Sequence, residues 1–249
     1  MPDKTNPKEL IWIIGASEGI GAALARYWAK QGARLILSAR SDARLNMLVS
    51  ELGSEHLALP LDILDPNQIK VAADKLAHFG PLDRVIHLAA QYDPGKIADI
   101  DLKTAAQIVS VNLTGCLHIA QLTPPMLRKD GQLALCGSVA GYMGLPQGQI
   151  YSATKAGVIN LAESLRVELQ GKVDVRLISP GFVDTRLTQR NAFSMPALMQ
   201  PDDAAKAIYR GLNGGQFEIH FPRRLTLALK LLRALPYWAS LRLTRRLVQ

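Results

Sequence analysis

The chain has 249 residues, a formal net charge of +8 at pH 7 and two cysteines. This length fits one α/β domain or two smaller ones. Cys116 and Cys136 lack metal or disulfide spacing, so they fit a reduced, cytosolic protein without a metal site. Residues 1–9 are polar, so we expect no signal or transit peptide, and no apolar run reaches the roughly 18 residues of a membrane span.

The first apolar run, residues 10–14, predicts a buried strand that leads into a glycine-rich turn. The apolar spacing of residues 22–28 then predicts a helix that ends at Gly32. Glycines between a strand and a helix let the backbone approach a pyrophosphate, whose charge the helix N-terminus stabilises. The turn therefore predicts a dinucleotide site. Its candidate binding residues are Gly15, Ser17, Glu18, Gly19, Ile20 and Gly21.

The second predicted strand, residues 34–40, bears on which nicotinamide nucleotide binds. Folds that prefer NAD place an acidic residue near the end of this strand, whereas an arginine accommodates the 2′-phosphate of NADP. Ala39 stands at the acidic position, Arg40 follows it, and Arg44 comes one helical turn later. We therefore predict NADP(H) rather than NAD(H). Two solvated surface arginines are the alternative, and Glu18 in the glycine turn counts against NADP.

Two further apolar runs predict the third and fourth strands, over residues 57–63 and 84–90. Asp62, near the end of the third predicted strand, is a candidate N-cap of the helix that we predict over residues 67–79. His87 lies inside the fourth run. A lone histidine in an apolar run is more often a hydrogen-bonded core residue than a catalytic one, so we expect His87 in the core.

The next two predicted elements each carry one polar residue in an apolar setting. Residues 108–122 predict a long buried helix, and the amide of Asn112 inside it must find hydrogen-bond partners. Residues 133–136 predict a fifth strand, with Ser138 at its carboxyl end. Open α/β sheets bind their ligands outside these carboxyl ends, so Ser138 is a candidate site residue.

Tyr151 and Lys155 follow Ser138 in the chain, and their spacing of four residues would place them on one face of a helix. A phenol titrates near pH ~10, and an ammonium within about 4–6 Å favours its ionised form. The two residues therefore predict a proton donor and acceptor whose pKa is lowered. Taken alone, two such residues are more often a solvated pair on an exposed helix.

With this serine, tyrosine and lysine, and with the spacing Gly-x-x-x-Gly-x-Gly over residues 15–21, the chain resembles the short-chain dehydrogenase/reductase family. The resemblance implies a Rossmann-type α/β fold, a doubly wound parallel sheet that forms a single domain over residues 1–222. Residues 223–249 would be a C-terminal helical appendage. The chain departs from the family at His87 and Leu88, where most relatives carry two asparagines.

The resemblance also implies a role for each candidate site residue. Tyr151 would be the general acid, Lys155 would lower its pKa and bond the nicotinamide ribose, and Ser138 would position the substrate oxygen. Asn112 would distort its helix and hold a water that leads to Lys155. Asp62 and Ile63 would contact the adenine ring. Ala89 and Ala90 are small residues that would let the cofactor ribose approach.

A sixth predicted strand, residues 174–179, is followed by a segment that resembles the family's contact with the nicotinamide. The segment starts with Pro180 and Gly181. By this resemblance the backbone of Val183 would bond the carboxamide, and Thr185 would bond the carboxamide or a phosphate.

Residues 223–249 carry seven basic side chains and no acidic one. On helical spacing, one face holds Leu225, Ala228, Leu229, Leu232 and Leu235, and the other holds Thr226, Lys230 and Arg233. Two interpretations of this basic amphipathic helix stay open. Its apolar face could lie in an anionic membrane, or it could cover the substrate pocket or a partner subunit. No nucleic-acid motif accompanies it, so we expect no nucleic-acid partner.

Together these features predict a cytoplasmic, NADP(H)-dependent oxidoreductase that transfers hydride between the nicotinamide and a small carbonyl or alcohol substrate. The tail and an apolar substrate lid over residues 188–200 favour a lipophilic substrate, with peripheral contact at the inner face of a membrane. Relatives pair through the helices near Asn112 and Tyr151, so we expect a homodimer or tetramer. The alternative is a catalytically silent NADP-binding regulatory or scaffolding protein.

Overall fold

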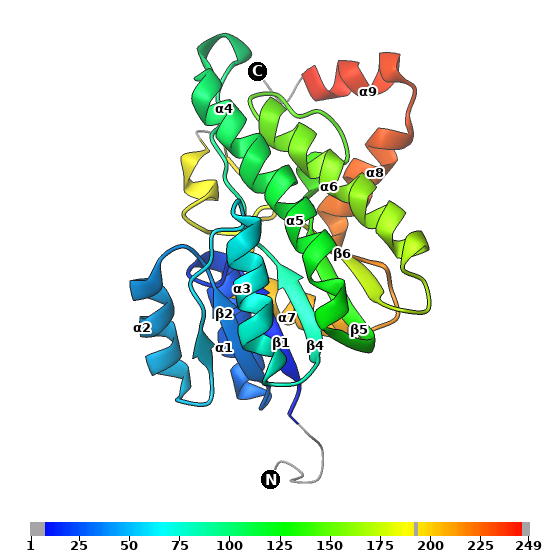
Figure 1. The fold of residues 1–249 in the computed structure, drawn as a ribbon. Coiled ribbons are helices and arrows are strands. Elements are labelled where there is room, and N and C mark those ends of the chain that lie inside the picture. Colours follow the sequence, from blue (N-terminus) through cyan, green and yellow to red (C-terminus); the bar gives the residue numbers. More distant parts are fainter. Residues whose placement is uncertain (1–7, 192–193, 246–249) are drawn as a thin grey trace.

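The structure, a computed structural model, describes residues 8–191 and 194–245. Its centre is a seven-stranded sheet in the order β3-β2-β1-β4-β5-β6-β7, with every neighbouring pair parallel (Figure 1). The order reverses between β1 and β4, which opens a crevice at the carboxyl ends of the strands. The strands are β1 Leu10–Ile14, β2 Arg34–Ser38, β3 Leu57–Ala58, β4 Leu82–His87, β5 Leu127–Cys136, β6 Asp174–Pro180 and β7 Glu218–Phe221.

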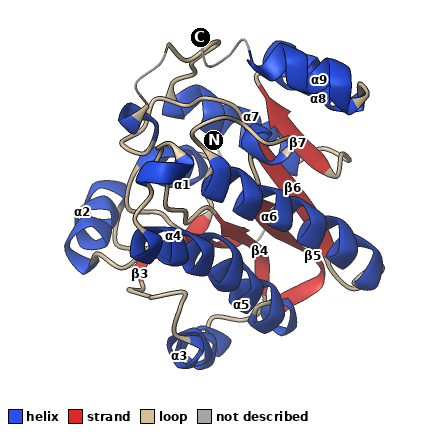
Figure 2. Ribbon diagram, turned by 90° about the horizontal axis from the view of Figure 1, so that it is seen from above, coloured by secondary structure: helices blue, strands red, loops and turns tan. Residues whose placement is uncertain are grey.

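Helices cover both faces of the sheet, so the predicted doubly wound α/β fold is confirmed (Figure 2). Helices α1, α2 and α7 contribute to one apolar core, and α3, α5 and α6 contribute to the other. The α-helices of the described residues are α1 Gly19–Lys30, α2 Asp42–Leu52, α3 Pro66–Ala77, α4 Leu102–Val109, α5 Gly115–Leu122, α6 Gln149–Glu168, α7 Pro201–Leu212, α8 Arg223–Ala234 and α9 Tyr237–Thr244.

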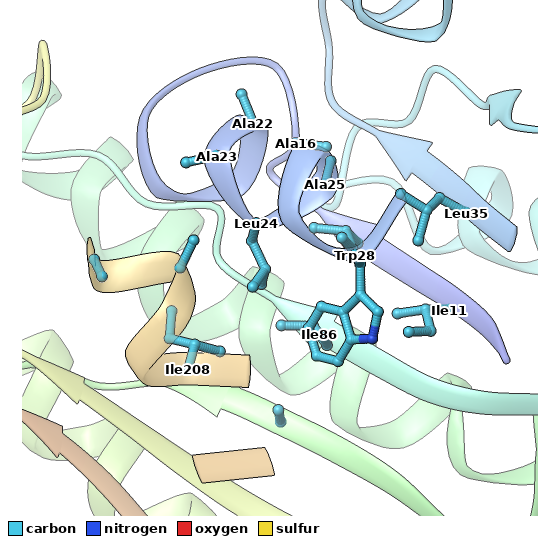
Figure 3. Close-up of a cluster of buried hydrophobic side chains, with 14 of the residues drawn as sticks. Ile11, Ala16, Ala22, Ala23, Leu24, Ala25, Trp28, Leu35, Ile86 and Ile208 are labelled. Carbon is cyan, nitrogen blue, oxygen red and sulfur yellow. The ribbon is translucent and has the colours of Figure 1, made fainter. Parts of the chain in front are cut away.

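The alternation of side chains along β1 explains why its sequence is apolar throughout. Ile11 and Ile13 point into the core under α1, whereas Trp12 and Ile14 point into the core on the opposite face. Successive residues of a strand face opposite sides, so a strand covered on both sides needs an unbroken apolar run. On the α1 side, Figure 3 shows the ring of Trp28 between Ile11 and Ile86.

The third strand is shorter than predicted. Residues 57–63 were expected to form it, but β3 contains only Leu57 and Ala58. It is an edge strand that pairs with β2 alone, and Pro60 has no N–H to donate to a ladder. Leu59 and Leu61 still donate to carbonyl oxygens of Leu37 and Ala39, so the chain continues beside β2 without regular pairing.

Four other elements differ from expectation. The helix predicted over residues 108–122 begins at Leu102, and a π turn, Ser110–Thr114, separates α4 from α5. Helix α7 and strand β7 were not predicted at all. The helix predicted after the third strand is present as α3, but its N-cap is Asp65 rather than Asp62, because the Asp65 carboxylate accepts from the N–H groups of Asn67 and Gln68.

The C-terminal segment forms two helices, and α8 turns part of its predicted apolar face toward the protein, since Leu225, Leu229 and Leu232 are half-buried. Thr226 and Lys230 were assigned to the opposite, polar face, yet Thr226 is fully buried and Lys230 forms an ion pair with Glu218 of β7. The apolar side chains of Leu227 and Leu231 are exposed instead. No helix of the described residues is long and apolar enough to cross a membrane.

Candidate active site

A cavity of about 510 Å³ lies at the carboxyl ends of the strands, where the strand order reverses between β1 and β4. Its lining includes Ser138, Tyr151 and Lys155, so three of the four predicted catalytic residues meet there. Asn112 is not among the lining residues. Every predicted cofactor-binding residue lines the cavity: Gly15, Ser17, Glu18, Gly19, Ile20, Gly21, Arg40, Asp62, Ile63, Ala89, Ala90, Tyr151, Lys155, Pro180, Gly181, Val183 and Thr185.

The glycine turn after β1 forms a closely packed cradle at one end of this cavity. Gly15 has φ +91°, in the left-handed region that favours glycine. A Cβ there would lie 2.5 Å from the backbone nitrogen of Ala89, and a Cβ at Gly21 would overlap the Gly15 carbonyl oxygen. Glycine at these two positions therefore lets the turn pack closely against the backbone after β4 and against itself, an arrangement that fits a pyrophosphate at the N-terminus of α1.

The charged residues around the cavity favour an anionic ligand. Arg44 donates to the Glu18 carboxylate at 2.7 Å, and Arg186 lies 3.8 Å from the same carboxylate. Glu18 therefore neutralises part of the arginine charge, whereas Arg40 is exposed and has no carboxylate partner among the described residues. Basic side chains outnumber acidic ones in the lining, where they are Arg40, Arg44, Lys155, Arg186 and Arg190 against Glu18 and Asp62.

Helix α6 places Tyr151 and Lys155 one turn apart, as their spacing predicts. Lys155 is almost completely buried, and its ammonium donates to the carbonyl oxygen of Cys136 at 2.7 Å. The ammonium lies 5.6 Å from the centre of the Tyr151 ring. Ser138, at the end of β5, accepts from the N–H of Ala140 at 3.1 Å. The end of β5 thus fixes both the serine and the lysine beside the tyrosine.

The electrostatic effect on Tyr151 differs from the predicted one. Burial raises the pKa of the Tyr151 phenol above its ordinary value, and this effect is larger than the lowering of the pKa by the Lys155 ammonium. The prediction that Lys155 lowers the pKa of Tyr151 below its ordinary value is therefore wrong. The phenol keeps its proton at neutral pH, and the Lys155 ammonium opposes part of the effect of burial.

Asn112 lies in the π turn between α4 and α5, so the predicted distortion of its helix is present. Its side chain is buried. The amide nitrogen donates to the carbonyl oxygen of Gln91 at 2.9 Å and to Thr154 Oγ1 at 3.1 Å, and the amide oxygen accepts from the N–H of Gln91 at 2.7 Å. Asn112 therefore joins the loop after β4 to the catalytic helix α6. The water expected beside it stays a prediction.

His87, at the end of β4, is buried as expected, but its Nδ1 lacks the expected hydrogen bond within the described part of the chain. Burial, together with the nearby Lys155 ammonium, lowers the pKa of His87 to about 3. The imidazole is therefore neutral at physiological pH. It does not line the cavity, so the structure gives no support to a catalytic role.

Tyr92 is a site residue that sequence reasoning missed. Its ring packs edge-on against Tyr151, with the ring centres 4.8 Å apart, and its hydroxyl donates to Asn191 Oδ1 at 2.7 Å. Its position just after Ala90, at the carboxyl end of a predicted strand, was the available indication. Burial raises the pKa of Tyr92 to about 12, so it stays neutral beside the catalytic tyrosine.

The segment predicted as a lid, residues 188–200, lies over this part of the site. Arg190 donates to the carbonyl oxygen of Tyr92 at 2.9 Å and lies 3.2 Å from the Asp93 carboxylate. Val183 forms a bridge with Met199, which ties the other end of the segment to the end of β6. Residues 192–193 of the predicted lid lie outside the described residues.

Comparisons with known proteins agree with this site. The family model described as short chain dehydrogenase matches residues 9–194. An uncharacterized oxidoreductase of Staphylococcus epidermidis is 32% identical over 82% of this chain and 91% of its own. A protein of Arabidopsis thaliana named 11-beta-hydroxysteroid dehydrogenase-like 3 is 31% identical over 86% of this chain and 74% of its own.

Two solved structures share the fold. An alcohol dehydrogenase of the archaeon Thermococcus sibiricus, complexed with 5-hydroxy-NADP, has a TM-score of 0.78 and 26% identity over 86% of this chain and 96% of its own. A short chain dehydrogenase/reductase of Burkholderia phymatum, in complex with NAD, has a TM-score of 0.82 and 23% identity over 90% of this chain and 92% of its own.

The chain therefore belongs to the short-chain dehydrogenase/reductase family. It is an oxidoreductase that acts on CH–OH or C=O groups with a nicotinamide cofactor. The cradle of Gly15 and Gly21 and the basic cavity lining fit that cofactor.

Proposed function

We propose that this oxidoreductase uses NADP(H) to reduce a lipophilic carbonyl compound to its alcohol, and that it also catalyses the reverse reaction. The observation that supports this best is the placement of the Tyr151 phenol beside Lys155 and Ser138 in the cavity, with the Lys155 ammonium 5.6 Å from the centre of its ring. A protonated phenol can give its proton to a carbonyl oxygen, which reduction requires as hydride reaches the carbon.

Each catalytic residue has one task in this proposal. When bound, the nicotinamide cofactor supplies or accepts the hydride. Tyr151 gives its proton to the carbonyl oxygen, and Ser138 bonds the same oxygen and stabilises its developing charge. Lys155 stabilises the phenolate left on Tyr151 and bonds the nicotinamide ribose. Asn112 holds the loop after β4 against α6 and supports a water on the proton route to Lys155.

The preference for NADP(H) is supported by Arg40 and Arg44, which line the cavity where an NAD-binding site would carry an acidic residue. An arginine fork binds phosphate through two hydrogen bonds, and the 2′-phosphate is the group that distinguishes NADP from NAD. Fluorescence titration with NADPH and NADH tests this preference. We expect tighter binding of NADPH, and tighter binding of NADH would overturn the proposal for the cofactor.

A lipophilic substrate is supported by the apolar side chains of Leu88, Val111 and Leu187 in the cavity lining and by the resemblance to a relative named for steroid oxidation. NADPH consumption should be measured against ketones and aldehydes of increasing apolar length. We expect kcat/KM to rise along this series, because each buried methylene contributes about 0.8 kcal/mol. A preference for short polar carbonyls would contradict the lipophilic assignment.

The NADPH-consumption assay also distinguishes an enzyme from a catalytically silent cofactor-binding protein. The departure at His87 and Leu88 favours that alternative, because most relatives carry two asparagines there, whereas the presence of Ser138, Tyr151 and Lys155 favours the enzyme. NADPH binding without turnover of any carbonyl or alcohol, in either direction, would support a regulatory or scaffolding protein.

We also propose a cytoplasmic homo-oligomer, a dimer or tetramer, whose residues 223–249 contact the inner face of a membrane. The exposed side chains of Val109 and Leu117 on the α4–α5 helix, and of Val167 on α6, support self-association through those helices. Light scattering after size exclusion tests it: Leu117→Glu should lower the mass to that of a monomer, and a wild-type monomer would refute it.

A further inference from the structure

Helices α8 and α9 turn large apolar side chains outward. We call this surface the α8–α9 face. Within the described residues these side chains are between 36% and 78% exposed, and Trp238 is the most exposed of them. An apolar surface of this extent on one part of a molecule usually marks an interaction site. The face consists of Leu227, Leu231, Leu235, Tyr237, Trp238, Leu241 and Leu243.

Polar contacts on the inner side fix this orientation. Thr226 Oγ1 and His220 Nδ1 are 2.6 Å apart, and Lys230 pairs with Glu218, so α8 is bound to β7 through polar groups. In α9, Ser240 and Thr244 are buried, and their hydroxyls donate to carbonyl oxygens of their own helix. Because these polar groups occupy part of the inner side, Leu227 and Leu231 of α8 are left facing outward.

The sequence left open whether the tail covers the substrate pocket. Among the described residues, no side chain from residue 223 onward lines the cavity. Leu225 packs against a lining residue: a Cβ added at Gly181 would lie 3.0 Å from Leu225 Cδ2. The first turn of α8 thus supports the cavity wall from behind. The apolar side chains in the rest of the tail do not cover the substrate pocket, so they must contact something other than the pocket.

The charge on the same helices identifies the kind of partner. No acidic residue follows Glu218, and Glu218 is already paired with Lys230. The arginines that remain have no carboxylate within ion-pair distance among the described residues, and they are Arg223, Arg224, Arg233, Arg242 and Arg245. A second copy docked on this face would bring the same arginines together, which like-charge repulsion disfavours.

An anionic lipid bilayer satisfies both features at once. Leucines of an interfacial helix enter the acyl boundary, tryptophan and tyrosine lie at the headgroup level, and arginines bind anionic headgroups. Figure 1 shows α9 at the end of the molecule toward which β4 points, the end that holds the cavity. Docking of the α8–α9 face would therefore bring the cavity end of the molecule close to the bilayer.

We propose that the α8–α9 face is a docking surface for anionic phospholipid bilayers, with Trp238 at the headgroup level. This deepens the proposed function by naming the partner through which a membrane-dissolved carbonyl substrate reaches the cavity, and in that respect it rests on the proposed function. The lipid contact itself depends only on the tail.

The chain contains its own probe for this contact. It has three tryptophans, of which Trp12 and Trp28 are fully buried and Trp238 is exposed. Full-length protein without cofactor should be mixed with vesicles of phosphatidylcholine alone or of phosphatidylcholine with phosphatidylserine. We expect sedimentation with the anionic vesicles, a blue shift of the emission, and loss of both in high salt. No sedimentation with anionic vesicles would overturn the proposal.

Variants separate the apolar and the charged contributions. Trp238→Ser should abolish the blue shift and weaken binding to anionic vesicles. Arg233→Ala combined with Arg242→Ala should weaken it by about 30-fold, since each arginine near an anionic surface contributes about one factor of five. Met47→Ser, an equally exposed apolar side chain on α2, is the matched control and should bind as the wild type does.

Two further measurements keep the outcomes distinct. Turnover of a short water-soluble ketone should be equal in the wild type and the Trp238→Ser variant, which shows that the variant is folded. Vesicle binding without turnover would refute the proposed reaction and leave the lipid contact standing. If light scattering shows that Trp238→Ser dissociates an oligomer and no vesicle binding occurs, the face is an interface between copies, and the lipid proposal is wrong.

Discussion

Two neighbouring influences act on the pKa of the Tyr151 phenol in opposite directions. Burial raises the pKa and the Lys155 ammonium lowers it, with burial the larger effect. A raised pKa keeps the proton on the phenol throughout the neutral range. Carbonyl reduction, which needs the protonated form, should therefore hold steady across neutral pH and fall only above about pH 10. Alcohol oxidation, which needs the phenolate, should instead rise with pH.

Replacement of Tyr151 by phenylalanine tests its role directly. The substitution removes the proton donor and keeps the ring that packs against Tyr92, so the fold and the cofactor cradle should persist. We expect kcat to fall by about 10²–10⁴-fold, the usual contribution of a general acid, with the Kd for NADPH nearly unchanged. Equal losses of turnover and binding would instead indicate a damaged fold.

His87 should make the stability of the protein depend on pH. Its pKa is about 3 in the folded chain, against about 6.5 when unfolded. Between these values the unfolded state binds one more proton, so stability should fall as the pH drops from about 6.5 toward 3, by about 1.4 kcal/mol per pH unit. Urea unfolding of His87→Asn should show a shallower slope than the wild type.

The control for that experiment is His78→Asn, since His78 is exposed at the end of α3. Its slope should match the wild type. A His87→Asn slope equal to the wild-type slope would mean that the imidazole is solvated or protonated in the folded protein. Because His56 and His220 also have lowered pKa values, only the difference between variant and wild type is informative.

At the scale of elements, the bond between the π turn and the loop after β4 should be structurally important. Asn112→Ala leaves the backbone N–H and carbonyl of Gln91 without their partner, which costs about 1–3 kcal/mol. We expect a lower free energy of unfolding in urea. Asn46→Ala, at an exposed position on α2, is the matched control with little expected effect. Equal stability of both variants would contradict the assigned role.

The elements that the sequence predicted well are those whose signal is local. β1 is apolar because both its faces are buried, and the glycine turn after it needs Gly15 for a left-handed backbone and close approach to Ala89. β3 was overestimated, because Pro60 has no N–H to donate and interrupts regular pairing with β2. Tyr92 was missed because its partner Asn191 lies far away in the chain.

The same limit applies to α8. Helical periodicity described its apolar and polar sides, but the contacts of Thr226 with His220 and of Lys230 with Glu218 decide which side faces the protein. These contacts come from β7, a strand that was not predicted. Periodicity within one helix therefore could not determine its orientation, since polar partners elsewhere in the fold outweigh the burial of a few leucines.

At the scale of the whole molecule, positive charge gathers at two places. The tail from Arg223 onward holds seven basic residues, and the cavity rim holds Arg40, Arg44, Arg186 and Arg190. Exposed charges are screened within about 10 Å at 0.1 M salt and about 3 Å at 1 M. Binding of any anionic ligand at these places should therefore weaken as the ionic strength rises.

This charge distribution predicts how cofactor preference depends on salt. Because NADPH carries an additional phosphate, its Kd should rise more steeply than that of NADH between about 0.1 M and about 1 M salt. Arg40→Ala should lower the preference for NADPH over NADH at low salt by roughly fivefold, which is the upper end for an exposed ion pair. It should also reduce the difference between NADPH and NADH in the salt dependence of Kd. Arg210→Ala, an exposed arginine on α7 away from the cavity, should change neither quantity. Parallel slopes for both nucleotides in the wild type would mean that the 2′-phosphate is not bound by these arginines.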